Sequence, residues 1–183
     1  MPQQYYYPQT KEELIRHYKL EPHPEGGYYA VTFVVGEKMK SPFASDDEER
    51  NIATCIYYVT SRSKYTLISA KAPLGKGLVD KTGDPLTKVI VMGDDIAKGE
   101  VRQLLVEGGW WKVSEVPEED REAVENGSAD GSRVGALISE VVTPGFHWND
   151  HTYLNQAKLR ELFAGCPRAE ELYEKYKKYF KEQ

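Results

Sequence analysis

Hydrophobic and polar positions along the chain predict a series of short strands. Most residues from Tyr28 to Val35 are β-branched or aromatic, and similar apolar runs recur at 51–60, 65–70, 86–92, 101–106 and 136–142. Glycine, proline and charged residues separate these runs, and 117–133 is a longer polar excursion with room for one helical turn. Short strands bounded by turns are typical of an all-β core.

Helical patterns lie at both ends of the chain. Thr10 and Glu13 have the spacing of a capping box, followed by apolar residues at helical intervals. From Gln156 onward two apolar stripes have helical spacing, with a break between them. The sequence has no internal repeat. We therefore expect one β domain at residues 10–155, which includes the N-terminal helix. A tail at 1–9 precedes this domain, and a C-terminal helical extension at 156–183 follows it.

Composition and charge narrow the possible partners. The chain has 183 residues, 40% hydrophobic and 29% charged, with a net charge of −5. Acidic and basic residues alternate along most of it, which argues against nucleic acid or an anionic membrane as a partner. The run Asp46 to Arg50 is predicted to be a solvated loop. The N-terminus lacks a signal-peptide pattern and there are only two cysteines, so we expect a cytoplasmic protein without disulfides.

Several motifs, in a fixed order, carry a family resemblance. They are Pro24–Tyr29 (PEGGYY), Thr54–Tyr58, Met92–Glu100 with Gln103, Gly108–Trp111, Glu140–Phe146 and Asn149–Leu154. This ordered set resembles the cupin-5 family of uncharacterised, RmlC-like cupins, and the resemblance covers about residues 10–165. The resemblance implies a double-stranded β-helix, the cupin jelly roll, in a homodimer related in shape to deoxysugar epimerases.

Histidine is absent between His23 and His147, although many cupins bind a catalytic metal through imidazoles of the middle strands. Tyr65 or Thr66, and later Trp111 with Lys112, stand where related proteins carry histidines. The remaining cluster is His147, Asp150 and His151. On an extended strand the two histidines would face one side and Asp150 the other, which leaves the ligand set incomplete. We expect no metal and no other cofactor.

Acid–base chemistry without a metal is the alternative that the resemblance suggests. Related sugar epimerases use a histidine held by a carboxylate, together with a tyrosine, because proton abstraction beside a carbonyl needs a base and an opposing acid. The base predicted here is His147. Glu25 or Glu140 is predicted to orient or replace it, and Gly26 with Gly27 permits the unusual backbone that brings Glu25 inward. The candidate acids are the tyrosines Tyr57, Tyr58 and Tyr65, and alternation alone does not decide between Tyr57 and Tyr58.

Other polar or aromatic residues are candidates for ligand binding. These are Gln103, Arg102, Glu100, Trp111, Lys112 and Glu140. Alternation along a strand would place Arg102 and Gln103 on opposite faces, so they would not serve one ligand together. Trp110 and Trp111 have two interpretations, stacking against a ligand or packing in a core or dimer interface.

The sequence therefore predicts a cupin that binds a small molecule and acts as a metal-independent isomerase, epimerase or cyclase. The alternative is a non-catalytic cupin that binds a ligand or serves as a scaffold. A metal-dependent dioxygenase is a third possibility that the shortage of histidine disfavours.

Overall fold

The computed structural model describes residues 8–42, 44, 46, 48–62, 64–69 and 79–180. The chain divides into two units, and each is described by itself. The first unit comprises residues 1–63 and 116–152, and the second comprises residues 64–115 and 153–183.

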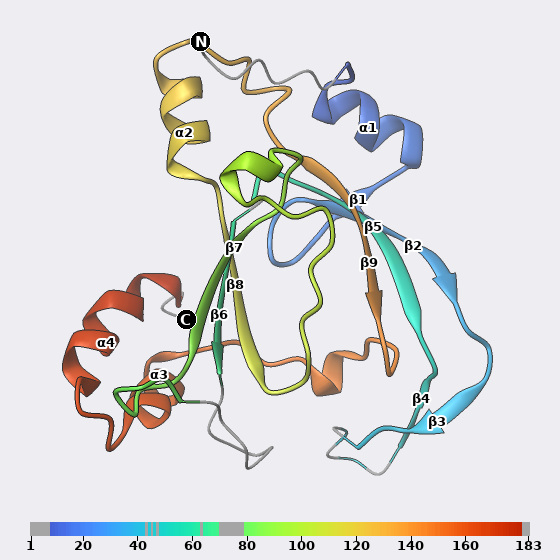
Figure 1. Ribbon diagram of the computed structural model, residues 1–183. Coiled ribbons are helices and arrows are strands. Elements are labelled where there is room, and N and C mark those ends of the chain that lie inside the picture. The colour runs from blue at the N-terminus through green and yellow to red at the C-terminus, as the bar shows by residue number, and fades with distance from the viewer. Residues whose placement is uncertain are drawn as a thin grey trace. The chain divides into compact units, whose positions relative to one another are not determined.

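An antiparallel sheet of four strands forms the centre of the first unit (Figure 1). In spatial order its strands are β1 (Glu21–Pro22), β2 (Tyr28–Val34), β5 (Thr54–Thr60) and β9 (Ala136–Val142). The register brings Tyr29 opposite Tyr58, and Tyr58 opposite Ile138. A separate hairpin is formed by β3 (Lys38–Lys40) and β4 (Glu49–Asn51).

Helix α1 (Lys11–Tyr18) covers one face of this sheet. The Thr10 hydroxyl accepts from the Glu13 amide, and the Glu13 carboxylate accepts from the Thr10 amide, so the predicted capping box is present. Such a cap contributes about 1 kcal/mol to helix stability. Leu14, Leu20 and Val59 are buried together, and Tyr57 packs against them. Because side chains alternate along β5, the neighbouring Tyr58 lies on the opposite face.

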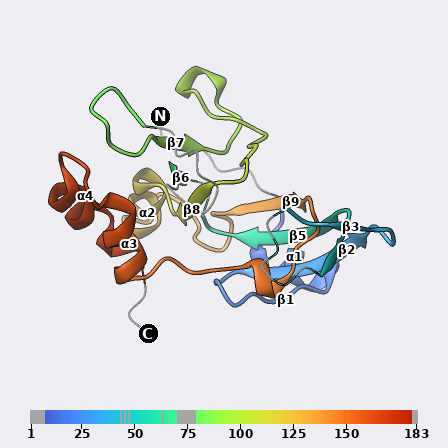
Figure 2. The ribbon, with the colours of Figure 1, turned by 90° about the horizontal axis from the view of Figure 1, so that it is seen from below.

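The second unit combines a three-stranded antiparallel sheet with C-terminal helices. Its strands, in the order β7-β6-β8, are β7 (Thr87–Val91), β6 (Lys64–Ser69) and β8 (Trp110–Glu115). Figure 2 shows α3 (Gln156–Phe163) and α4 (Ala169–Tyr176) side by side. The core comprises Ile68 of β6 and the apolar faces of both helices, including Leu159, Phe163 and Tyr176. Four short elements complete the described chain: η1 (Ile96–Lys98), η3 (Lys177–Tyr179) and, in the first unit, α2 (Glu118–Glu125) and η2 (Trp148–Asp150).

Most of the predicted strands are confirmed, and the chain is mainly sheet with a few short helices. The predicted strand 51–60 is divided, because β4 ends at Asn51 and β5 begins at Thr54. The strand predicted at 101–106 is wrong, since only Val101 forms a bridge, with Met92. Both edges of β6 are already paired, with β7 and β8, which leaves that apolar run no partner there. The described sheets are open, and the double-stranded β-helix and the domain boundaries stay predictions.

Candidate functional site

The PEGG turn before β2 is fixed to β5 through its backbone. Gly26 and Gly27 have φ values of 92° and 79°, in the left-handed region that favours glycine. In this conformation the Glu25 carbonyl accepts from Arg62 Nη1 at 2.9 Å, and the Gly26 carbonyl accepts from the Tyr58 hydroxyl. The predicted unusual backbone at the glycine pair is therefore confirmed.

Glu25, which this turn presents, lies beside a histidine that comes from the other end of the first unit. Glu25 Oε1 is 3.2 Å from His151 Nε2, and the two side chains are 40% and 22% exposed. A carboxylate at this distance orients an imidazole. Both side chains are partly open to solvent, although the Nε2 atom of His151 is itself buried.

Tyr58 of β5 reaches the turn that carries Glu25. Burial raises the pKa of the Tyr58 phenol, and the carboxylates of Glu25 and Glu140 act in the same direction; a hydrogen bond with Thr60 and the charge of Arg62 oppose them. The phenol is therefore protonated at neutral pH, with its proton donated to the Gly26 carbonyl. Glu140 comes from β9, on the same face of the sheet as Tyr58, where it is paired with Ile56.

Aromatic rings border the Glu25–His151 pair. The His23 ring lies 5.3 Å from that of Tyr58 and 6.4 Å from that of Trp148, between ring centroids. Trp148 in turn contacts His151 edge to face at 5.4 Å and Phe146 at 4.9 Å. Trp148 and Phe146 are 49% and 42% exposed. They give the site an open apolar side on which a ring or hydrocarbon of a ligand can pack.

The segment 143–151, which we call the strap, carries His151 and is held along the residues that precede β5. Thr143 Oγ1 donates to the Ile52 carbonyl at 2.9 Å, and the Gly145 amide donates to the Asn51 carbonyl at 2.7 Å. Further along, the Phe146 amide donates to Thr54 Oγ1 at 3.0 Å. The position of His151 thus depends on a run of contacts within the first unit.

His147, predicted to be the base, has a different local role. The strap is not extended here: η2 (Trp148–Asp150) is a 3₁₀ turn, and the exposed His147 caps it by accepting from the Asn149 amide at Nδ1, at 3.2 Å. The assumption that His147 and His151 share one face of a strand is therefore wrong. A histidine directly before a short polar stretch, H-W-N-D here, is the signal that could have indicated a cap.

Tyr57, the other predicted catalytic residue of the first unit, faces away from Glu25. Its ring lies 5.0 Å from that of Tyr18, in the apolar cluster beneath α1. Tyr58, which stood beside it as a candidate acid, occupies the site face instead. Sequence reasoning considered His151 only as a metal ligand and did not consider His23, because contacts between a turn and a strap have no fixed spacing in the sequence.

The remaining predicted residues belong to the second unit. Tyr65 of β6 is buried, and Trp111 packs against the helical core, which is the packing alternative. Glu100 closes a turn by accepting from the Asp95 amide at 2.9 Å. The other three side chains are exposed, namely Lys112 on β8 and Arg102 and Gln103 in an irregular segment, where Arg102 lies 3.3 Å from Asp94. Their roles in ligand binding stay predictions.

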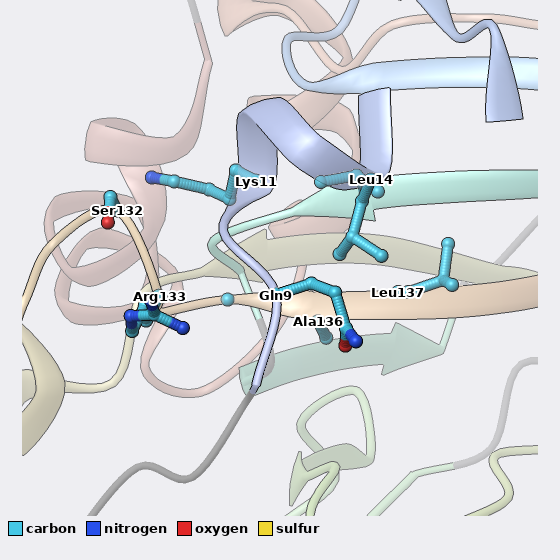
Figure 3. A pocket seen from close by; sticks show the side chains of 9 residues that line it. Gln9, Lys11, Leu14, Ser132, Arg133, Ala136 and Leu137 are labelled. Carbon is cyan, nitrogen blue, oxygen red and sulfur yellow. The ribbon is translucent and has the colours of Figure 1, made fainter. Parts of the chain in front are cut away.

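Figure 3 shows a small cavity in the first unit. Neither Glu25 nor His151 is among the residues that line it. Leu14 of α1 and Leu137 of β9 line it, together with Lys11, Arg133 and neighbouring residues. Its volume of about 10 Å³ holds roughly one water molecule. This cavity is therefore too small to be the ligand site.

The described residues contain neither a candidate metal site nor a candidate membrane-spanning helix. In that part of the chain, no group of three or more histidine, cysteine, aspartate or glutamate side chains is arranged to hold a metal ion. No helix there has the length and apolar character needed to span a membrane.

Comparisons with known proteins identify relatives whose function is not described. Residues 12–154 match the family Cupin_5, described as Cupin superfamily (DUF985). An uncharacterized protein of Saccharomyces cerevisiae, YML079W, is 30% identical over 187 aligned residues, which cover 90% of this chain and 85% of that protein. A hypothetical protein from Leishmania major has a similar structure, with a TM-score of 0.61, 24% identity, and coverage of 91% and 98% of the two chains. Protein SO0799 from Shewanella oneidensis gives a TM-score of 0.55 at 20% identity, covering 93% and 94%.

Proposed function

Because this chain belongs to the Cupin_5 family of the cupin superfamily, we propose that it binds a small carbonyl compound and moves a proton on it without a metal. The reaction class is isomerisation, epimerisation or cyclisation. The observation that carries this proposal is the 3.2 Å approach of Glu25 Oε1 to His151 Nε2, beside the protonated Tyr58.

The proposed roles follow from the chemistry of the three side chains. With Nε2 of His151 facing Glu25, Nδ1 is the nitrogen that takes the proton from the carbon next to the carbonyl. The electron pair of that C–H bond becomes the enolate, and Glu25 stabilises the imidazolium. Tyr58 donates its proton to the enolate, either at oxygen or at carbon. This assignment replaces His147 and Tyr57 by His151 and Tyr58.

The apolar side of the site supports binding of a ligand that has a ring. Trp148 and Phe146 are about half exposed and contact each other edge to face. We further propose the jelly-roll fold and the homodimer that the family resemblance implies, and the cytoplasmic location expected from the N-terminal pattern and the two cysteines.

Solvent deuterium exchange tests the proposal. The protein is incubated in D₂O with nucleotide-linked 4-keto sugars, which carry acidic protons beside a carbonyl, and incorporation is followed by mass spectrometry. We expect exchange by the unchanged protein, and a rate about 100-fold lower for Glu25→Gln, because the imidazolium loses its partner. Glu21→Gln, an exposed glutamate of β1, is the matched control and keeps the rate. No exchange above background by the unchanged protein would contradict the proposal and favour the non-catalytic alternative.

A further inference from the structure

Arg50 lies at the end of the strap that carries His151. It comes from β4 and is 3% exposed, so the interpretation of 46–50 as a solvated loop is wrong for this residue. Its Nε and Nη2 donate to Asp150 Oδ2 and Oδ1, both at 2.8 Å. A bidentate pair of this kind fixes direction as well as distance. Asp150 directly precedes His151.

The same guanidinium is also connected to Asn149 of η2, through the carboxylate of Asp46. Arg50 Nη2 donates to Asp46 Oδ2 and Oδ1 at 2.8 and 3.0 Å. Asp46 Oδ2 accepts in turn from Asn149 Nδ2 at 3.1 Å. Two successive residues of the strap, Asn149 and Asp150, are thus connected to one buried arginine.

The carboxylates around Arg50 are ionised at neutral pH. Hydrogen bonds from Arg50 are the largest cause that lowers the pKa of Asp150 and of Asp46. Glu48 lies farther from the guanidinium, at 3.8 Å, and its side chain is 69% exposed, so it contributes little to the cluster. The pairs with Asp46 and Asp150 therefore hold the cluster together.

From this geometry we infer that Arg50 is a positioning residue for His151, an inference that rests on the proposed function. The backbone at residue 150 is fixed by the bidentate pair, and the His151 ring then reaches Glu25 at 3.2 Å. A displacement of about 1 Å in such a contact can lower a rate by roughly 100-fold. Arg50 acts through His151 and does not itself touch the reacting atoms.

Amide hydrogen exchange of Arg50→Lys tests the structural part. Lysine keeps the charge but has no planar fork, so it cannot hold Asp150 and Asp46 in the same way. We expect exchange at residues 148–151 to rise about tenfold or more while the amides of β5 keep their rates. The control is Arg121→Lys, which changes an exposed arginine of α2 that pairs with Glu118 and should leave residues 148–151 unchanged.

Two results would overturn the inference: unchanged exchange at 148–151 in Arg50→Lys, or an equal rise at 148–151 and in β5, which indicates global destabilisation. Asp150→Asn provides a second variant that keeps the shape of the side chain and should give the same local rise.

In the proton-exchange assay, Arg50→Lys should lower kcat by roughly 10- to 100-fold with little change in KM. If the unchanged protein is inactive while the local rise occurs, the proposed function fails and the anchoring of the strap by Arg50 stands.

Discussion

Replacing Arg168 by methionine is expected to lower the melting temperature by about 5–10 °C. Arg168 Nε donates to Asp84 Oδ2 at 2.7 Å, and Asp84 is 1% exposed. The same oxygen accepts from Thr82 Oγ1 at 2.8 Å, whereas Oδ1 has no hydrogen-bond partner among the described residues. Without the guanidinium, the buried carboxylate keeps only neutral donors, which is unfavourable because its charge is not compensated.

Calorimetry of matched variants checks this expectation. Lys177→Met removes a cation of similar exposure, 48% against 44% for Arg168, that pairs only locally with Glu174. Such an exposed pair contributes little, so its melting temperature should change by no more than roughly 2 °C. Adding Asp84→Asn to Arg168→Met should recover part of the loss, since the buried charge is then gone. Equal melting temperatures for Arg168→Met and Lys177→Met would show that the buried pair is not stabilising.

Gly27→Ala is expected to lower the free energy of unfolding by roughly 2–4 kcal/mol and to displace the PEGG turn. A Cβ at this position would lie 2.6 Å from the Val59 carbonyl oxygen and 3.0 Å from the Tyr58 ring. The φ of 79° adds backbone strain for any L-residue. Since the Val59 carbonyl is backbone, it cannot yield as a flexible side chain would.

The control is Gly127→Ala, because Gly127 has a similar φ of 74° and nothing within 4 Å of an added Cβ. It should cost only about 1 kcal/mol, the backbone part of the effect. Chemical denaturation of both variants separates the backbone strain, which both share, from the atomic overlap with β5, which only Gly27→Ala has. The rate of proton exchange on the substrate should fall in Gly27→Ala because the turn that carries Glu25 moves. Equal losses of stability in the two variants would mean that the close approach of the turn to β5 is not what Gly27 provides.

The strands and helices were largely predictable, because their signals are local. The run Ala136–Val142 was predicted with the bounds that β9 has, since this mainly apolar run is stopped by Pro144 and Gly145. The error at 101–106 has a non-local cause. That segment is apolar enough for a strand. However, Trp110–Glu115 pairs with one edge of β6, and β7 pairs with the other edge. Pairing choices between distant segments are not encoded in the residues of one segment alone.

The candidate site was predictable only in part. Glu25 could be identified because two adjacent glycines indicate an unusual turn next to it. The expectation that His147 and His151 share one face of a strand was wrong because a 3₁₀ turn changes the direction of side chains within four residues. The faces of Tyr57 and Tyr58 depend on which side of the sheet α1 covers, which alternation does not define. The buried Arg50 stands in a run of charges whose composition alone indicates solvent exposure.

The measurement that tests the account most directly compares the two histidines of the strap. Proton exchange with the 4-keto sugar panel is measured for His151→Gln and His147→Gln under the same conditions. Since His151 lies 3.2 Å from Glu25 and His147 only caps η2, we predict a rate about 100-fold lower for His151→Gln and an unchanged rate for His147→Gln. A large loss in His147→Gln with normal exchange in His151→Gln would contradict the assignment of the site.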